Sequence, residues 1–280
     1  PTRYRSKERV GQASGYRSKR PYPRLHESCY ICNLRKREAS TVNTKPFKTI
    51  TTKTTHNTVV KPGELVDVVE LTPLQLVDRR AYNLMIGAAW DKIDQDIEHS
   101  VRKRDLRPTK MNAMNDRLDS SIGRLMGARV RVKIERDGQP YTLSVPLLET
   151  VAEPVRSDGN VYYRFPRELR KLISDSNIFA RLQKDVMFAL SSKYALALYE
   201  MLQKRGNLRH KTQETFTVEE LRSLLGVQPG KLPHYKNFKS RALKPAIEEV
   251  GSLASYGISF HENKEGRTVK SITLGWWQKT

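Results

Sequence analysis

The stretch 216-FTVEELRSLLGVQPGKLPHYKNFKSRALKPAIEEV-250 decides the fold. Thr217 is an N-cap residue with Glu220 three positions later, a pairing that satisfies the first free amides of a helix. Gly226 then provides a C-terminal stop, and a second helix follows a loop that contains proline and glycine. Ahead of this stretch, residues 191–205 (SSKYALALYEMLQKR) have the three-and-four spacing of an amphipathic packing helix. The order predicts a packing helix followed by a helix-turn-helix.

The last helix of this stretch has an apolar side and a basic side. Tyr235, Phe238, Ala242, Ala246 and Val250 form the apolar stripe, which we expect to be core. Pro245 removes a backbone donor and crowds the preceding turn, so a kink or the end of a segment is expected there. The donors expected to face outward, toward an acidic partner, are Lys236, Asn237, Lys239, Ser240, Arg241 and Lys244.

A hairpin pattern follows that helix. In residues 257–277 (GISFHENKEGRTVKSITLGWW), two alternating apolar runs flank turn residues at 263–266. Lys264, Arg267 and Lys270 cluster at the expected tip. A basic hairpin after a helix-turn-helix predicts a winged helix, whose third helix fits a major groove roughly 12 Å wide while the hairpin touches flanking backbone.

The first half of the chain repeats this order of elements. Residues 71–93 predict a helix with Thr72 as N-cap and Pro73 in its first turn, and residues 116–126 predict a shorter helix that carries Arg117 and Arg124. Residues 129–148 predict a hairpin with an Asp-Gly turn. Its first strand presents a basic face made of Arg129, Arg131 and Lys133. A strand at 160–165 and a helix at 166–173 complete an α+β chain of two tandem winged helices.

The composition points to a polyanionic partner. Lys and Arg number 51 against 30 Asp and Glu, a formal charge of +21. The sign alone does not separate DNA from RNA or acidic lipid. Residues 1–64 hold 15 basic and 4 acidic side chains, so about half of the excess lies in a segment with little apolar periodicity. We expect a basic flexible arm there, which either contacts phosphates without reading sequence or only adds solubility.

Membrane and metal classes have little support. No apolar run approaches the roughly 20 residues of a membrane span, and no secretory signal is seen, so a cytoplasmic protein is expected. The two cysteines fit a reducing compartment. His26, Cys29 and Cys32 offer three zinc ligands, with His56 as a distant fourth, but a second CxxC is missing. We therefore predict no bound metal and no cofactor.

The sequence lacks the residues that the catalytic alternatives need. No two histidines lie two apart, as a rolling-circle nicking enzyme would need, and the glycines near Lys231 do not match a phosphate loop. His99 and Arg102 match one short piece of a tyrosine recombinase, near an expected helix end, without a matching nucleophile segment. An enzyme is therefore the least favoured class.

The pattern over residues 65–276 resembles a known family. Residues 191–205, 216–227 and 235–250, followed by the hairpin sequence GRTVKSITL, are similar to the C-terminal domain of initiator proteins of iteron-bearing, theta-replicating plasmids. Residues 71–86 (LTPLQLVDRRAYNLMI) resemble the opening helix of their first domain. The expected division is a basic arm at 1–62, a first winged helix at 63–185 and a second at 186–280.

The resemblance implies a function. Such a protein binds origin repeats in double-stranded DNA, helps to open an AT-rich segment, and recruits the host initiator and helicase. A monomer-dimer equilibrium and repression of its own promoter are also implied. The third helix of the second domain would read bases at Lys236, Asn237, Lys239, Ser240 and Arg241, and Arg117 and Arg124 would hold phosphates. The alternative is a winged-helix transcriptional repressor without origin function.

Overall fold

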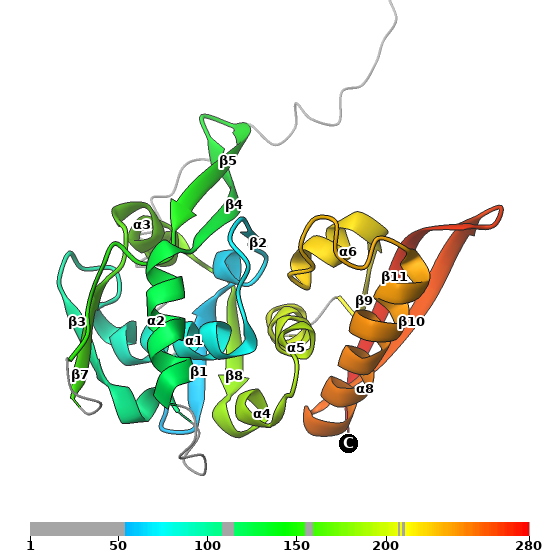
Figure 1. Cartoon of the computed structure of the whole chain (residues 1–280). Helices are drawn as coiled ribbons and strands as arrows, with labels where there is room; N and C mark the ends of the chain where they lie inside the picture. The colour runs from blue at the N-terminus through cyan, green and yellow to red at the C-terminus, as the bar shows by residue number, and fades with distance from the viewer. Residues whose placement is uncertain (1–53, 108–114, 155–158, 207, 209–210, 280) are drawn as a thin grey trace, which may run out of the picture. The chain divides into compact units, whose positions relative to one another are not determined.

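A computed structural model of the chain describes residues 54–107, 115–154, 159–206, 208 and 211–279 (Figure 1). The helices and hairpins predicted for both halves are present there in the predicted order. His26, Cys29 and Cys32, the weak zinc candidates, and most of the basic arm lie outside the described residues.

The first domain is built around helix α1 (Leu76–Ala89), which packs against α2 (Asn115–Gly127), β1 (Thr58–Pro62) and β3 (His99–Arg102). Strands β4 (Arg129–Arg136) and β5 (Gln139–Pro146) form the predicted hairpin, with β2 (Val69–Glu70) at its edge. Asp137 and Gly138 have φ of 52° and 71°, as an Asp-Gly hairpin turn requires. The remaining elements of the domain are β6 (Thr150–Ala152), β7 (Asn160–Arg164), α3 (Arg167–Asp175) and the short helices Gly63–Leu65, Trp90–Lys92 and Lys103–Leu106.

The folded region starts earlier than the sequence predicted. Residues 58–62, assigned to the arm, form β1, which pairs antiparallel with β8 (Phe179–Gln183). Val59 and Val60 of this strand are buried. The strand was missed because its two apolar residues are adjacent, without the alternation that marks a half-buried strand.

Helix α1 also begins later than predicted. Its N-cap is Gln75, which forms a capping box with Asp78, and the assignment of Thr72 as N-cap is wrong. Thr72 instead pairs with β4: its amide donates to the Arg129 carbonyl at 3.2 Å, and its Oγ1 accepts from the Arg129 amide at 3.3 Å. The polar groups of Thr72, which the local pattern assigned to a helix cap, are instead hydrogen-bonded to a distant strand.

Helix α5 (Lys193–Arg205) follows the short helix α4 (Lys184–Ala189) and lies between the two halves of the chain. Ser192 caps it, and it packs against β8 on one side and α8 (Lys244–Leu253) on the other. Nearly all its residues are buried, including Glu200. The predicted packing helix is therefore enclosed rather than amphipathic.

The second domain contains helix α6 (Val218–Leu224), the predicted third helix and a long hairpin of β10 (Tyr256–Glu265) and β11 (Thr268–Gln278). Strand β9 (Gln213–Thr217) adds a third strand to this sheet by pairing with β11, which the sequence did not predict. The hairpin runs alongside α8 and extends past it (Figure 1).

The third helix changes pitch before Pro245. It consists of α7 (Tyr235–Phe238), a π-helical turn (Lys239–Leu243) and α8. The Lys244 amide donates to the Lys239 carbonyl, five residues back. Pro245 has no backbone amide to donate to the preceding turn, and that preceding turn is the π-helical one. The disturbance predicted at Pro245 is therefore present, and the helix continues beyond it.

Candidate nucleic-acid interface

The helix-turn-helix of the second domain is held by local contacts. Thr217 Oγ1 accepts from the Glu220 amide at 3.1 Å, and Glu220 Oε2 accepts from the Thr217 amide at 2.9 Å, so the predicted capping box is confirmed. The hydrogen bond from the Thr217 amide lowers the pKa of Glu220. Gly226 has φ of 73° and ends the helix.

The apolar stripe of the third helix points into the core. Phe238, Ala242, Ala246 and Val250 are at most 1% exposed. Burying this side leaves the opposite side of the helix in solvent. Four of its six predicted DNA-contact residues are exposed: Lys236, Ser240, Arg241 and Lys244.

Asn237 and Lys239, the other two, are half-buried. The Lys239 ammonium lies 2.7 Å from Glu262 Oε1 of β10 and 5.5 Å from the centre of the Phe260 ring. Tyr235 donates its hydroxyl to the same Glu262 oxygen at 2.7 Å. The helix and the hairpin are therefore linked at Glu262, a residue that the sequence analysis missed.

The hairpin tip carries the three predicted basic residues, Lys264, Arg267 and Lys270, all exposed. The Lys270 ammonium lies 3.6 Å from Glu265, and both side chains are more than 60% exposed. Ion pairs this open are weak and are screened by salt, so the tip stays available to phosphates.

The matching helix of the first domain is arranged differently. Arg124 of α2 donates from Nη2 and Nε to both carboxylate oxygens of Asp78, at 2.7 and 3.0 Å. Asp78 is fully buried, and this hydrogen bond raises the pKa of Arg124. The side chain of Arg117 lies outside the described residues. In the free protein the Arg124 guanidinium is therefore bonded to a buried carboxylate of its own domain.

The basic face of β4 is formed as predicted, with Arg129, Arg131 and Lys133 exposed. Arg131 and Lys133 line a groove of about 530 Å³. The other wall of this groove comes from β9 and α6 and carries acidic side chains, among them Glu214, Glu219 and Glu220. Part of the basic face thus looks toward carboxylates of the second domain.

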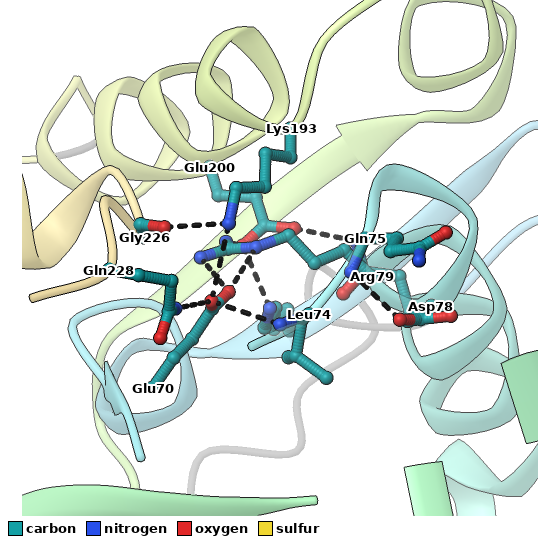
Figure 2. Close-up of polar contacts among 11 residues, drawn as sticks. Glu70, Leu74, Gln75, Asp78, Arg79, Lys193, Glu200, Gly226 and Gln228 are labelled. Carbon is teal, nitrogen blue, oxygen red and sulfur yellow. Dashed lines mark hydrogen bonds and ion pairs between the residues drawn. The ribbon is translucent and has the colours of Figure 1, made fainter. Parts of the chain in front are cut away.

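A buried group of charges joins the two domains (Figure 2). Glu70 of β2 accepts from Arg79 Nε at 2.8 Å through one oxygen. Its other oxygen accepts at 3.2 Å from the Leu74 amide and at 3.2 Å from Gln228 Nε2. Gln228 lies in the turn after α6, so a first-domain carboxylate holds the helix-turn-helix of the second domain.

Lys193 of α5 extends this contact. Its Nζ donates to the Gly226 carbonyl at 2.7 Å and lies 3.8 Å from Glu70 Oε2. A Cβ on Gly226 would come within 2.9 Å of Arg79 Nη2 and 3.0 Å of Glu70 Oε1. Glycine is needed here for its positive φ and also for the close approach.

Glu200 of α5 completes the group, at 0% exposure. It accepts from Lys61 Nζ at 2.8 Å and Asn83 Nδ2 at 2.6 Å, and lies 3.7 Å from Arg79 Nη1. Burial lowers the pKa of Lys61, and Glu200 opposes that shift. We call Lys61, Glu70, Arg79, Lys193 and Glu200 the junction cluster. The only sequence signal for it was a glutamate inside the apolar run YALALYEML.

Other site classes gain no support. Within the described ranges, no three or more His, Cys, Asp or Glu side chains are grouped to hold a metal ion. No helix among those residues is long and apolar enough to cross a membrane. His99 and Arg102 lie in β3, where the His99 ring packs against Tyr163 and Phe165 in the core.

Two winged helices in tandem, the second with an exposed basic helix beside a basic hairpin, define a DNA-binding protein of the winged-helix class. The chain belongs to the family of initiator replication proteins. The family model described as "Initiator Replication protein, WH1" matches residues 58–203, and "Initiator Rep protein, WH2" matches residues 217–276. The predicted fold and family resemblance are confirmed.

A solved structure supports the fold. The crystal structure of the Pi initiator protein in complex with iteron DNA has a TM-score of 0.57 at 19% identity, covering 80% of this chain and 97% of that one. Domains 2 and 3 of RctB (TM-score 0.43, 10% identity, 72% and 81% covered) are less similar. The WH1 domain of MSBI1.176, a replication protein isolated from a multiple sclerosis patient, is also less similar. Its TM-score is 0.31 at 14% identity, covering 42% of this chain and 88% of that one. The search of curated proteins found no match.

Proposed function

We propose that this protein starts plasmid replication by binding repeated duplex sites in the origin. The observation that carries the proposal is the basic face Lys236, Ser240, Arg241 and Lys244, exposed beside a basic hairpin tip in a chain of the initiator family. The Pi initiator protein, which has the same fold, was solved with iteron DNA. In this proposal the third helix enters the major groove and the tip holds flanking phosphates.

The first domain has a supporting role in this proposal. Arg129, Arg131 and Lys133 of β4 offer cations to backbone phosphates, with Arg117 of α2 as another candidate. Arg124 of α2 would reach a phosphate only by leaving the carboxylate of Asp78. Phosphate contacts hold the register of a protein on DNA but carry no sequence information. Residues 63–185 would therefore add affinity and salt dependence, and residues 186–280 would add sequence preference.

The later steps are proposed from family membership. Bound copies would open an adjacent AT-rich segment and recruit the host initiator and helicase, with host enzymes doing the chemistry. A dimer would repress the protein's own promoter. Permanganate reactivity of thymines on a supercoiled origin would measure opening. Reactivity that does not change on adding the protein would count against that step.

The first test is a footprint on the DNA that flanks the protein's own gene, at two salt concentrations. Protection of evenly spaced direct repeats supports an initiator, whereas one inverted pair supports the repressor alternative. Arg241→Ala with Lys236→Ala should remove the footprint. Lys92→Ala, which removes an exposed cation of the first domain, should leave it. A wild-type protein without any discrete footprint would contradict both functions.

A further inference from the structure

The inference concerns Glu262, a carboxylate at the point where the third helix meets the hairpin. Its side chain is 17% exposed, and it faces three groups: the Lys239 ammonium at 2.7 Å, the Tyr235 hydroxyl at 2.7 Å and the Lys264 ammonium at 3.9 Å. The hydrogen bond from Lys239 is the main cause that lowers the pKa of Glu262, so the carboxylate is charged at neutral pH.

Lys239 differs from its neighbours because of this contact. Its side chain is 37% exposed, and the Phe260 ring lies under the ammonium as a second partner. Arg241 is exposed, and no ion pair to it is found among the described residues. Two cations two residues apart on one helix are thus in different states: one is free to meet phosphate, and the other is already neutralised.

Non-specific DNA binding depends on cations that replace counterions along the phosphate backbone. A lysine held by a carboxylate at 2.7 Å contributes less to this process, since phosphate must first displace the carboxylate. We propose that Glu262 withholds Lys239 from phosphates and thereby lowers affinity for arbitrary DNA. Glu262 is then a positioning residue that increases the ratio of specific to non-specific binding. The inference rests on the proposed DNA-binding function.

The test is non-specific binding of the full chain to a random-sequence duplex, measured over a series of salt concentrations. Glu262→Gln keeps an acceptor for Tyr235 but removes the charge. The slope of log affinity against log salt should steepen by about one, as for one further phosphate contact, and affinity near 0.1 M salt should rise about fivefold. Affinity for the footprinted site should change less, so the specificity ratio falls.

Two controls separate this from a general charge effect and from a structural role. Glu265→Gln removes the same charge three residues away, from a pair that is exposed on both sides, and should change the slope by less than half as much. In a Lys239→Met background, Glu262→Gln should have a much smaller effect on the slope, because its action passes mainly through Lys239 and only the longer contact with the exposed Lys264 is left.

The outcomes are distinct. Equal slopes for the wild type and Glu262→Gln, or equal effects of the Glu262 and Glu265 variants, would overturn the inference. So would an undiminished effect in the Lys239→Met background. A wild-type chain that binds no duplex at all would instead overturn the proposed function. Unfolding midpoints of each variant confirm that folded protein is compared.

Discussion

The two winged helices share a motif but place several basic side chains differently: these are paired with carboxylates in the first domain and exposed in the second. In the first domain, Arg124 is bonded to the buried Asp78, and Lys61 and Arg79 are buried with carboxylates. In the second domain, Lys236 and Arg241 project into solvent from the corresponding region. These three first-domain cations hold the protein together, and these two second-domain cations are left for a partner. The contrast is between these positions and not between whole domains, because Arg129, Arg131 and Lys133 of the first domain are exposed and Lys239 of the second is paired with Glu262. A basic residue on a winged helix therefore does not by itself mark a DNA contact.

The largest expected effect comes from removing a carboxylate of the buried junction cluster. Glu200→Ala removes the carboxylate that accepts from Lys61 and Asn83 at 0% exposure. A buried cation left without its partner costs about 3–5 kcal/mol, so the free energy of unfolding should fall by that amount in urea titration. Glu248→Ala, which breaks an exposed pair with Lys244, should change it by less than about 0.5 kcal/mol. Equal effects would remove the distinction between buried and exposed charge.

The next prediction tests how tightly the junction is packed. Gly226→Ala forces a side chain into positive φ and against Arg79 and Glu70. We expect a loss of at least about 1–2 kcal/mol in unfolding free energy from the backbone alone. Gly251→Ala, inside α8 with nothing within 4 Å of an added Cβ, should gain about 0.5–1 kcal/mol. A tolerated Gly226→Ala would show that the turn and β2 are not in close contact.

Replacing Arg241 and Arg124 by alanine, one at a time, sharpens the comparison. Arg241→Ala should weaken binding to the footprinted site by about 1–3 kcal/mol and leave stability unchanged. Arg124→Ala should instead lower the free energy of unfolding by about 1–3 kcal/mol, because buried Asp78 loses its partner. Affinity by fluorescence anisotropy and unfolding by circular dichroism measure the two effects. If Arg124→Ala mainly weakened DNA binding, the first domain would resemble the second after all.

The smallest effect concerns pH. Burial, followed by the nearby charges of Arg170 and Arg164, lowers the pKa of His99 below its usual 6.5. The folded state thus keeps His99 neutral, while the unfolded chain binds a proton below about pH 6.5. The unfolding free energy should therefore fall as the pH drops below that value.

His99→Phe should flatten this dependence between pH 7.5 and 5.5 in urea titrations. The same slope in both proteins would mean that other groups cause the pH response.

Local features of the sequence were sufficient for much of the fold. The capping box at Thr217 and Glu220, the Asp-Gly turn at residues 137–138 and the stripe from Phe238 to Val250 all appear where residue pattern placed them. Each depends on residues that lie close together along the chain. For that reason no knowledge of the rest of the chain was needed.

Two of the misses have a common cause. Strand β9 forms because β11 offers it a partner more than fifty residues later, and Thr72 is not a cap because Arg129 takes its polar groups. Both outcomes depend on contacts between distant segments. Residue pattern carries no information about such contacts unless the two segments are already known to meet.

The sequence by itself determined the two winged helices, their order, and the family, because caps, turn residues and apolar periodicity are properties of neighbouring residues. Only the tertiary structure decided which cations are available to a partner. It placed Glu262 against Lys239, Asp78 against Arg124, and Glu70 at the junction of the domains. The physical reason is that a charge is neutralised by whatever lies within a few ångströms in space, whatever the distance along the chain.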